Sequence, residues 1–130
     1  FNAELGAGKT QFVKGMAKEL GIKRNINSPT FILIKEYPYE YKKSKGELVH
    51  IDAWRLESIL ELKKLEIENY IKNGNILAVE WAGRAQEYLN SISSSRGRKS
   101  DTNLIKIYIE IKYVSLNSRG LKIYDQEVTE

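Results

Sequence analysis

The segment at residues 3–10 reads Ala3-Glu4-Leu5-Gly6-Ala7-Gly8-Lys9-Thr10. It follows the phosphate-loop pattern G-x-x-x-x-G-K-[ST] at every position except the first, where alanine replaces glycine. Gly6 and Gly8 allow the backbone to curl so that successive N–H groups face phosphate oxygens, and the N-terminus of a following helix attracts the same negative charge. The segment therefore predicts a loop that binds the phosphates of a nucleotide.

Lys9 and Thr10 carry the chemistry of this motif, because the lysine reaches the β and γ phosphates and the hydroxyl ligates Mg²⁺. The alternative is a glycine-containing helix start that matches the pattern by chance. A helical period after Thr10, with Gly21 as its C-cap, favours the phosphate loop. Only Phe1 and Asn2 precede the segment, so we expect the chain to lack its true N-terminus and most of the strand that supports the loop.

Composition restricts the class of protein. The chain has 130 residues, 42% of them hydrophobic, which predicts a single domain that buries roughly two-thirds of its unfolded surface. It has no cysteine, and this excludes a disulfide framework and any thiolate metal site. No signal peptide or long apolar run is present, so we expect a cytoplasmic protein that does not bind a membrane.

The net charge of +4 permits contact with a polyanion without requiring it. Some of the basic residues are clustered in two predicted loops, one with Lys42, Lys43 and Lys45 and the other with Arg96, Arg98 and Lys99. Solvated loops are the favoured interpretation, and contact with a nucleic acid or a protein partner is the alternative.

Two strands are predicted to form a hairpin. Residues 31–34, together with Tyr37, are β-branched and aromatic, and residues 48–52 form a second apolar run. We expect Pro38 to end the first strand, and the lysine-rich loop through Gly46 to separate the two.

The second strand ends at Asp52, and a third apolar run, at residues 76–80, ends at Glu80. Ligands of open α/β sheets gather at the carboxyl ends of strands, so Asp52 stands where a Walker B aspartate would hold Mg²⁺ or its water. His50 lies two residues before Asp52 and therefore on the same strand face. A structural, hydrogen-bonded histidine is favoured there over direct chemistry.

The remaining segments alternate between helix and strand signals. Residues 57–72 have a helical period that is imperfect near Leu65, which predicts two short helices. Residues 81–89 are expected to begin another helix, and the serine-rich and basic residues 91–100 predict a surface loop.

Near the end of the chain, residues 105–112 alternate isoleucine with polar side chains, the period of a half-exposed antiparallel strand. Residues 117–120 predict a turn into a last strand at residues 121–124. The fold expected from all segments is an α/β, P-loop NTPase-like three-layer fold, with a mixed, largely parallel central sheet and a C-terminal antiparallel hairpin.

Four motifs in order resemble one family. They are L-G-A-G-K-T at residues 5–10, S-P-T-F at 28–31, H-x-D-x-[YW]-R at 50–55 and E-W at 80–81. Together they resemble the TsaE (YjeE) family, the bacterial ATPase subunit of the machinery that makes threonylcarbamoyladenosine in tRNA. Ala3 and Trp54 depart from the usual glycine and tyrosine, and neither change removes a phosphate or metal contact.

The resemblance implies an ATPase that uses ATP and Mg²⁺, works with TsaD-type and TsaB-type protein subunits, and reaches tRNA through that complex. It implies Thr10 and Glu80 as Mg²⁺ ligands. It also implies a catalytic group of Lys9, Asp52 and Thr30, in which Asp52 and Thr30 stand where a base or a γ-phosphate sensor belongs. The residues themselves do not divide the roles of Asp52 and Glu80. The nucleotide-binding residues implied are Glu4, Leu5, Gly6, Ala7, Gly8, Lys9, Thr10 and Gln11.

Two other functions share parts of this pattern. A small-molecule kinase would need a lid with arginines that clamp the transferring phosphate, and the only arginine-bearing loop is the serine-rich segment at residues 91–100. A non-enzymatic nucleotide switch or tRNA-binding module would use residues 28–31 as its moving segment. ATP turnover without an acceptor would separate the ATPase from the kinase, and binding without turnover would favour the switch.

Overall fold

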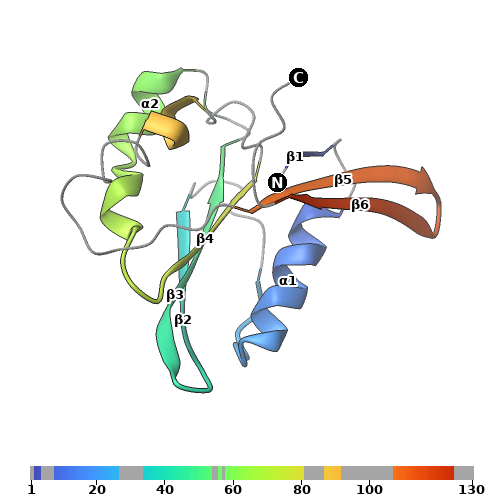
Figure 1. Ribbon diagram of the computed structural model, residues 1–130, viewed down its shortest axis with the longest axis horizontal. Helices are drawn as coiled ribbons and strands as arrows, with labels where there is room; N and C mark the ends of the chain where they lie inside the picture. The colour runs from blue at the N-terminus through green and yellow to red at the C-terminus, as the bar shows by residue number, and fades with distance from the viewer. Residues whose placement is uncertain are drawn as a thin grey trace.

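The computed structural model describes residues 2–3, 8–26, 34–53, 56, 58–80, 87–91 and 107–124. In this part of the chain an α/β fold contains two three-stranded sheets, β2–β3–β4 and β1–β5–β6 (Figure 1). In chain order, the elements are β1 (Asn2–Ala3), α1 (Lys9–Glu19), β2 (Ile34–Tyr41), β3 (Ser44–Asp52), α2 (Ile59–Lys64), the 3₁₀ helix η1 (Ile67–Tyr70), β4 (Ile76–Glu80), β5 (Tyr108–Ser115) and β6 (Ser118–Tyr124).

Helix α1 begins where the sequence predicts. At its other end, Gly21 follows the C-cap residue Leu20 and has a φ of 76°. The N–H of Gly21 donates to the carbonyl of Lys18 at 3.1 Å, and the N–H of Ile22 donates to the carbonyl of Ala17 at 2.9 Å. This pair of bonds is a Schellman motif, which satisfies carbonyls that the helix leaves without partners. The predicted stop at Gly21 is confirmed.

The hairpin of β2 and β3 is confirmed, but its predicted boundaries are wrong. Strand β2 continues through Pro38, which pairs with Glu47, and only the turn Lys42-Lys43 separates the strands. A proline is tolerated here because β2 lies at the edge of its sheet as described, where the ladder does not need every N–H group. Lys45, expected in a loop, lies on β3 instead and is exposed.

Strand β3 lies between the other two strands of its sheet, and both of its faces are covered. Leu48 packs with α1 residues Val13 and Ala17 in one apolar cluster. The alternate residues Val49 and Ile51 pack on the opposite face in a second cluster, with residues of α2 and η1. Successive side chains of β3 point to opposite faces of the sheet, so one face packs against α1 and the other against α2 and η1. This agrees with the predicted three-layer arrangement.

The two short helices predicted in residues 57–72 are confirmed as α2 and η1, with the break at Leu65 and Glu66. Ser58 caps α2, because its hydroxyl oxygen accepts a 3.3 Å hydrogen bond from the N–H of Glu61. Strand β4 covers the predicted residues 76–80 without change. A helical segment at residues 87–91 covers the end of the helix expected over residues 81–89.

The C-terminal antiparallel hairpin is also confirmed, as β5 and β6. Its turn comes at Leu116 and Asn117, earlier than predicted, so β6 already begins at Ser118. Strand β1 pairs in parallel with β5. In the described residues each sheet has one parallel and one antiparallel pairing, so the expected mixed character is confirmed, whereas parallel pairings do not predominate among the described strands.

Several predicted features fall outside the described residues, among them residues 31–33 of the first strand, the loop at residues 92–100 and the start of the helix at residues 81–86. Across the helices that the structure describes, none combines the length and the hydropathy that crossing a membrane requires. The single-domain organisation stays a prediction.

Candidate nucleotide and metal site

The carboxyl ends of β3 and β4 bring two acidic residues side by side. The strands run in parallel with Asp52 opposite Glu80, and the N–H of Ala53 donates to the carbonyl of Glu80 at 3.1 Å. Residues opposite each other in parallel strands point to the same sheet face. The two strand-end carboxylates that the sequence singled out therefore share one edge and one face of the sheet.

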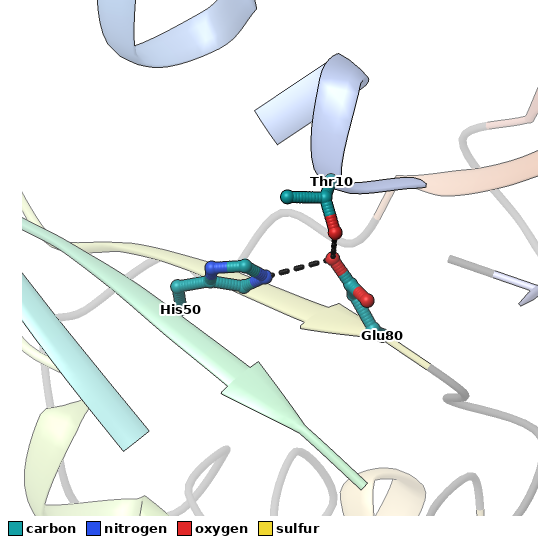
Figure 2. A network of polar contacts seen from close by, with 3 residues as sticks. All are labelled: Thr10, His50 and Glu80. Carbon is teal, nitrogen blue, oxygen red and sulfur yellow. Dashed lines mark hydrogen bonds and ion pairs between the residues drawn. The ribbon is translucent and has the colours of Figure 1, made fainter. Parts of the chain in front are cut away.

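Glu80 is linked to α1 and to β3 by two hydrogen bonds at one oxygen atom. The hydroxyl of Thr10 donates to Glu80 Oε1 at 3.2 Å, and His50 Nε2 lies 2.8 Å from the same oxygen (Figure 2). His50 is fully buried, and Glu80 is 3% exposed. The first turn of α1 is thus joined to the end of β4 through residues that are 70 positions apart in sequence.

Lys9 completes this group of polar residues. It is buried at 6% exposure, and burial lowers the pKa of its ammonium, while the negative charges of Glu80 and Asp52 oppose that shift. Negative charge brought close to a buried ammonium favours its protonated form, so a phosphate group beside Lys9 would oppose the effect of burial in the same direction as the two carboxylates. The site therefore has a cation at the place where the phosphate-loop motif requires one.

The N-terminus of α1 offers backbone donors as well. Gly8 is the N-cap residue and has a φ of 104°, a conformation that favours glycine because it has no Cβ. Glycine also has no side chain that could cap the helix, which leaves the first N–H groups of α1 to other acceptors. A phosphate group is a suitable acceptor at this end of the helix dipole.

The oxygen donors of the site fit Mg²⁺. Thr10 supplies a hydroxyl and Glu80 a carboxylate, and hard oxygen ligands are those that Mg²⁺ prefers. Within the described ranges no three His, Cys, Asp or Glu side chains converge into a metal cage. Mg²⁺ at nucleotide sites commonly takes one or two protein ligands together with phosphates and water, so Thr10 and Glu80 match that mode of binding.

The structure brings four predicted site residues together, namely Lys9, Thr10, Asp52 and Glu80. Gly8 lies beside them at the N-cap, whereas the side chain of Gln11 is exposed on α1. The predicted phosphate-binding residues Glu4, Leu5, Gly6 and Ala7 and the predicted catalytic residue Thr30 lie outside the described residues.

His50 is the residue whose place in the site was not predicted. The sequence favoured a structural, hydrogen-bonded histidine, and the structure confirms that the ring is buried and hydrogen-bonded to Glu80. The sequence offered one clue to the hydrogen-bond partner of His50, which is that His50 and Asp52 lie on the same strand face. The neighbouring strand ends in Glu80. Only the pairing of β3 with β4 makes Glu80 the neighbour.

The residues of this site lie within the part of the chain that is similar to known proteins. The sequence model of the family described as threonylcarbamoyl adenosine biosynthesis protein TsaE matches residues 1–114. The chain belongs to the TsaE family. The match includes every described residue of the site, and it confirms the family that the four motifs resemble.

Curated TsaE proteins are similar over most of this chain, and each is named tRNA threonylcarbamoyladenosine biosynthesis protein TsaE. That of Bacillus subtilis is 43% identical over 86 residues, which are 66% of this chain and 51% of that protein. That of Haemophilus influenzae is 35% identical over 88 residues, 68% of this chain and 53% of the relative. The Aquifex aeolicus protein is 36% identical over 122 residues, 92% of this chain and 71% of the relative.

The matched region thus spans about half the length of the first two TsaE relatives.

Proposed function

We propose that this TsaE-family chain binds ATP with Mg²⁺ and hydrolyses ATP in support of threonylcarbamoyladenosine synthesis on tRNA. The pathway is the one in the names of the TsaE relatives. The observation that carries the proposed chemistry is the hydrogen bond from Thr10 to Glu80 beside the buried Lys9. It brings the hydroxyl of a phosphate-loop motif against a strand-end carboxylate, the arrangement that a nucleotide-bound Mg²⁺ needs.

Phosphate binding is the first role in this proposal. Lys9 lies at the start of α1 and is the cation for the β and γ phosphates, and the N–H groups of residues 4–11 surround their oxygens. Strand β1 followed by helix α1 around the phosphate-loop motif supports a P-loop fold for this part of the chain.

Metal binding is the second role. Thr10 and Glu80 hold Mg²⁺, and when bound the ion neutralises charge that develops on the phosphate oxygens. Asp52 lies opposite Glu80 at the end of β3 and is close enough to act on the charge of Lys9. We assign it to orient the attacking water, which leaves the direct metal contact to Glu80. Thr30, in the S-P-T-F motif, senses the γ phosphate.

Partner proteins are the third element. We propose that TsaD-type and TsaB-type subunits bind the chain in the cytoplasm, and that tRNA is reached through the resulting complex. Exposed apolar side chains support a protein partner, since several large ones lie on and beside the β5–β6 hairpin. These side chains are Ile107, Tyr113, Val114, Leu116, Leu121 and Ile123.

One titration tests the proposal. ATP hydrolysis is measured for the intact protein alone, then with increasing amounts of the TsaD-type and TsaB-type proteins from the same organism, and without any small-molecule acceptor. Weak turnover that rises with both partners is expected. No turnover until a small-molecule acceptor is added would identify a kinase instead, and nucleotide binding without turnover in the full complex would identify a switch.

A further inference from the structure

His50 has an unusual hydrogen-bonding state. Its Nδ1 is buried and lacks a hydrogen-bond partner, and among buried side-chain nitrogens and oxygens of the described residues it is alone in this. A neutral imidazole has one N–H donor and one acceptor nitrogen, and an ionised carboxylate can only accept. The bond to Glu80 therefore requires the proton on Nε2 and leaves the lone pair on the unpartnered Nδ1.

The ring of His50 is enclosed by the protein. It is 0% exposed on the central strand β3, opposite Ala78, whose small side chain leaves room for the imidazole. Its Nε2 is engaged in the bond to Glu80 Oε1, so that nitrogen is not free to ligate a metal ion itself. The contact of His50 with the site therefore runs through Glu80 alone among the site residues described here.

The two donors to Glu80 Oε1 differ in kind. Thr10 is itself a proposed metal ligand, so its hydroxyl must adjust when Mg²⁺ binds. His50 has no such second task, and its 2.8 Å bond is shorter than the 3.2 Å bond from Thr10. Partners of this type orient metal ligands, and their loss typically costs about 10- to 100-fold in metal affinity or activity.

We propose that His50 is a positioning residue for the Mg²⁺ site: its Nε2–H holds the carboxylate of Glu80 in place while Thr10 and the nucleotide engage the metal (Figure 2). This inference rests on the proposed function, because it assumes that Glu80 serves a nucleotide-bound Mg²⁺. It assigns the buried histidine to metal affinity and not to packing or direct catalysis.

The test measures Mg²⁺ titrations of fluorescent ADP binding to the intact protein, without any turnover. His50→Leu replaces the imidazole with an apolar side chain of similar size and removes the Nε2–H donor. The Mg²⁺ concentration for half-maximal enhancement should rise about 10- to 100-fold, while ADP binding in EDTA stays within twofold of wild type. His50→Gln places an amide N–H near the position of Nε2 and should restore most of the Mg²⁺ response.

Leu48→Val is the matched control. Leu48 is fully buried two residues earlier on the same face of β3, but it packs in the apolar cluster with α1 and is no hydrogen-bond donor. It tests whether a packing defect in this strand alters the Mg²⁺ response, and no change is expected. A rise as large as that of His50→Leu would reduce His50 to a packing residue and overturn the inference.

Two outcomes separate this inference from the proposed function. If wild type shows no Mg²⁺-dependent ADP binding, the proposed metal site is wrong. If wild type responds normally and His50→Leu does too, the metal site stands and the positioning role is wrong.

A measurement on wild type covers the case in which His50→Leu does not fold. The ¹⁵N chemical shifts of the His50 ring should report a proton on Nε2 and none on Nδ1, and the reverse tautomer would contradict the inference. His50→Asn, whose amide is too short to reach Glu80, should then show the Mg²⁺ defect that His50→Gln repairs.

Discussion

The hydroxyl of Thr10 donates a 3.2 Å hydrogen bond to Glu80 Oε1, and so joins the first turn of α1 to the last residue of β4. Both residues were expected to ligate Mg²⁺, yet nothing in their sequence separation requires them to meet. A metal ion held by both would bind where this hydrogen bond already brings the two oxygens together. This contact would bring the two proposed Mg²⁺ ligands together in advance, which reduces the cost of ordering them.

Lys9→Ala should abolish ATP turnover and weaken nucleotide binding, since Lys9 is the cation of the phosphate-loop motif and is buried against Glu80 and Asp52. Isothermal titration with ADP and a phosphate-release assay with both partners measure the two effects, and far-UV circular dichroism should be unchanged. Lys14→Ala, on the exposed surface of α1, is the control and should behave as wild type. Normal hydrolysis by Lys9→Ala would remove the phosphate-loop assignment.

Glu80→Ala and Asp52→Ala should have different effects, although the two residues are opposite each other in the sheet. Glu80→Ala should impair nucleotide binding only when Mg²⁺ is present. Asp52→Ala should spare binding and reduce turnover by about 10²- to 10³-fold, the usual cost of removing one group that acts in the transition state. The measurements are the nucleotide affinity of each variant with Mg²⁺ and with EDTA, together with its turnover rate. If Asp52→Ala lost Mg²⁺-dependent binding and Glu80→Ala lost only turnover, the two roles would be exchanged.

Thr30→Ala should blunt the stimulation of ATPase activity by partners more than it lowers the basal rate. The sequence predicts that Pro29 favours an extended backbone, from which the hydroxyl of Thr30 would meet the γ phosphate in the complex with the partners. Lys23→Ala, in the exposed turn before this segment, is the control. The idea fails if wild type alone already turns over at its maximal rate, or if Thr30→Ala keeps full stimulation.

Gly46→Ala and Gly15→Ala should change stability in opposite directions. A Cβ at Gly46 would lie 2.3 Å from the carbonyl oxygen of Gly74, so backbone must shift, at a cost of about 1–3 kcal/mol or more. At Gly15, on the exposed side of α1, the added Cβ meets no atom within 4 Å, and alanine should add about 1 kcal/mol of helix propensity. Urea unfolding of both variants tests this, and equal midpoints would contradict it.

Tyr88→Phe should destabilise the protein by about 1.5–3 kcal/mol at pH 8, because the hydroxyl of Tyr88 donates a 2.7 Å hydrogen bond to the carboxylate of Glu68. Burial first, and then this bond, raise the pKa of Tyr88 to about 12 from an ordinary value of 10.0. The stabilisation is thus complete below pH 10 and is lost as the pH rises through about 12.

Urea unfolding at several alkaline pH values should show the advantage of wild type over Tyr88→Phe shrinking across that interval. Tyr41→Phe is the control, because the hydroxyl of Tyr41 makes a longer, exposed bond of 3.2 Å to Glu19, and at pH 8 it should cost less. A constant difference between wild type and Tyr88→Phe from pH 8 to 12 would show that the hydroxyl is not held as described.

Local patterns predicted most elements of the fold. The stop of α1 near Gly21, the break near Leu65 and the strand at residues 76–80 all depend on residues close in sequence, where helix period and capping act directly. Pro38 misled the prediction, because a proline interrupts a central strand but not an edge strand, and only the sheet reveals which kind β2 is.

The sequence alone predicted the chemical groups of the site: a lysine and a hydroxyl after a glycine-containing segment, and a carboxylate at the end of each of two apolar runs. Such signals are readable because phosphate binding and strand burial each restrict residue types at short spacing. Which groups meet was decided by tertiary structure. The parallel register of β3 and β4 sets Asp52 opposite Glu80, and α1 on that sheet face brings Thr10 to the same carboxylate as His50. Register and packing depend on contacts between residues far apart in sequence, and a local sequence pattern does not predict those contacts.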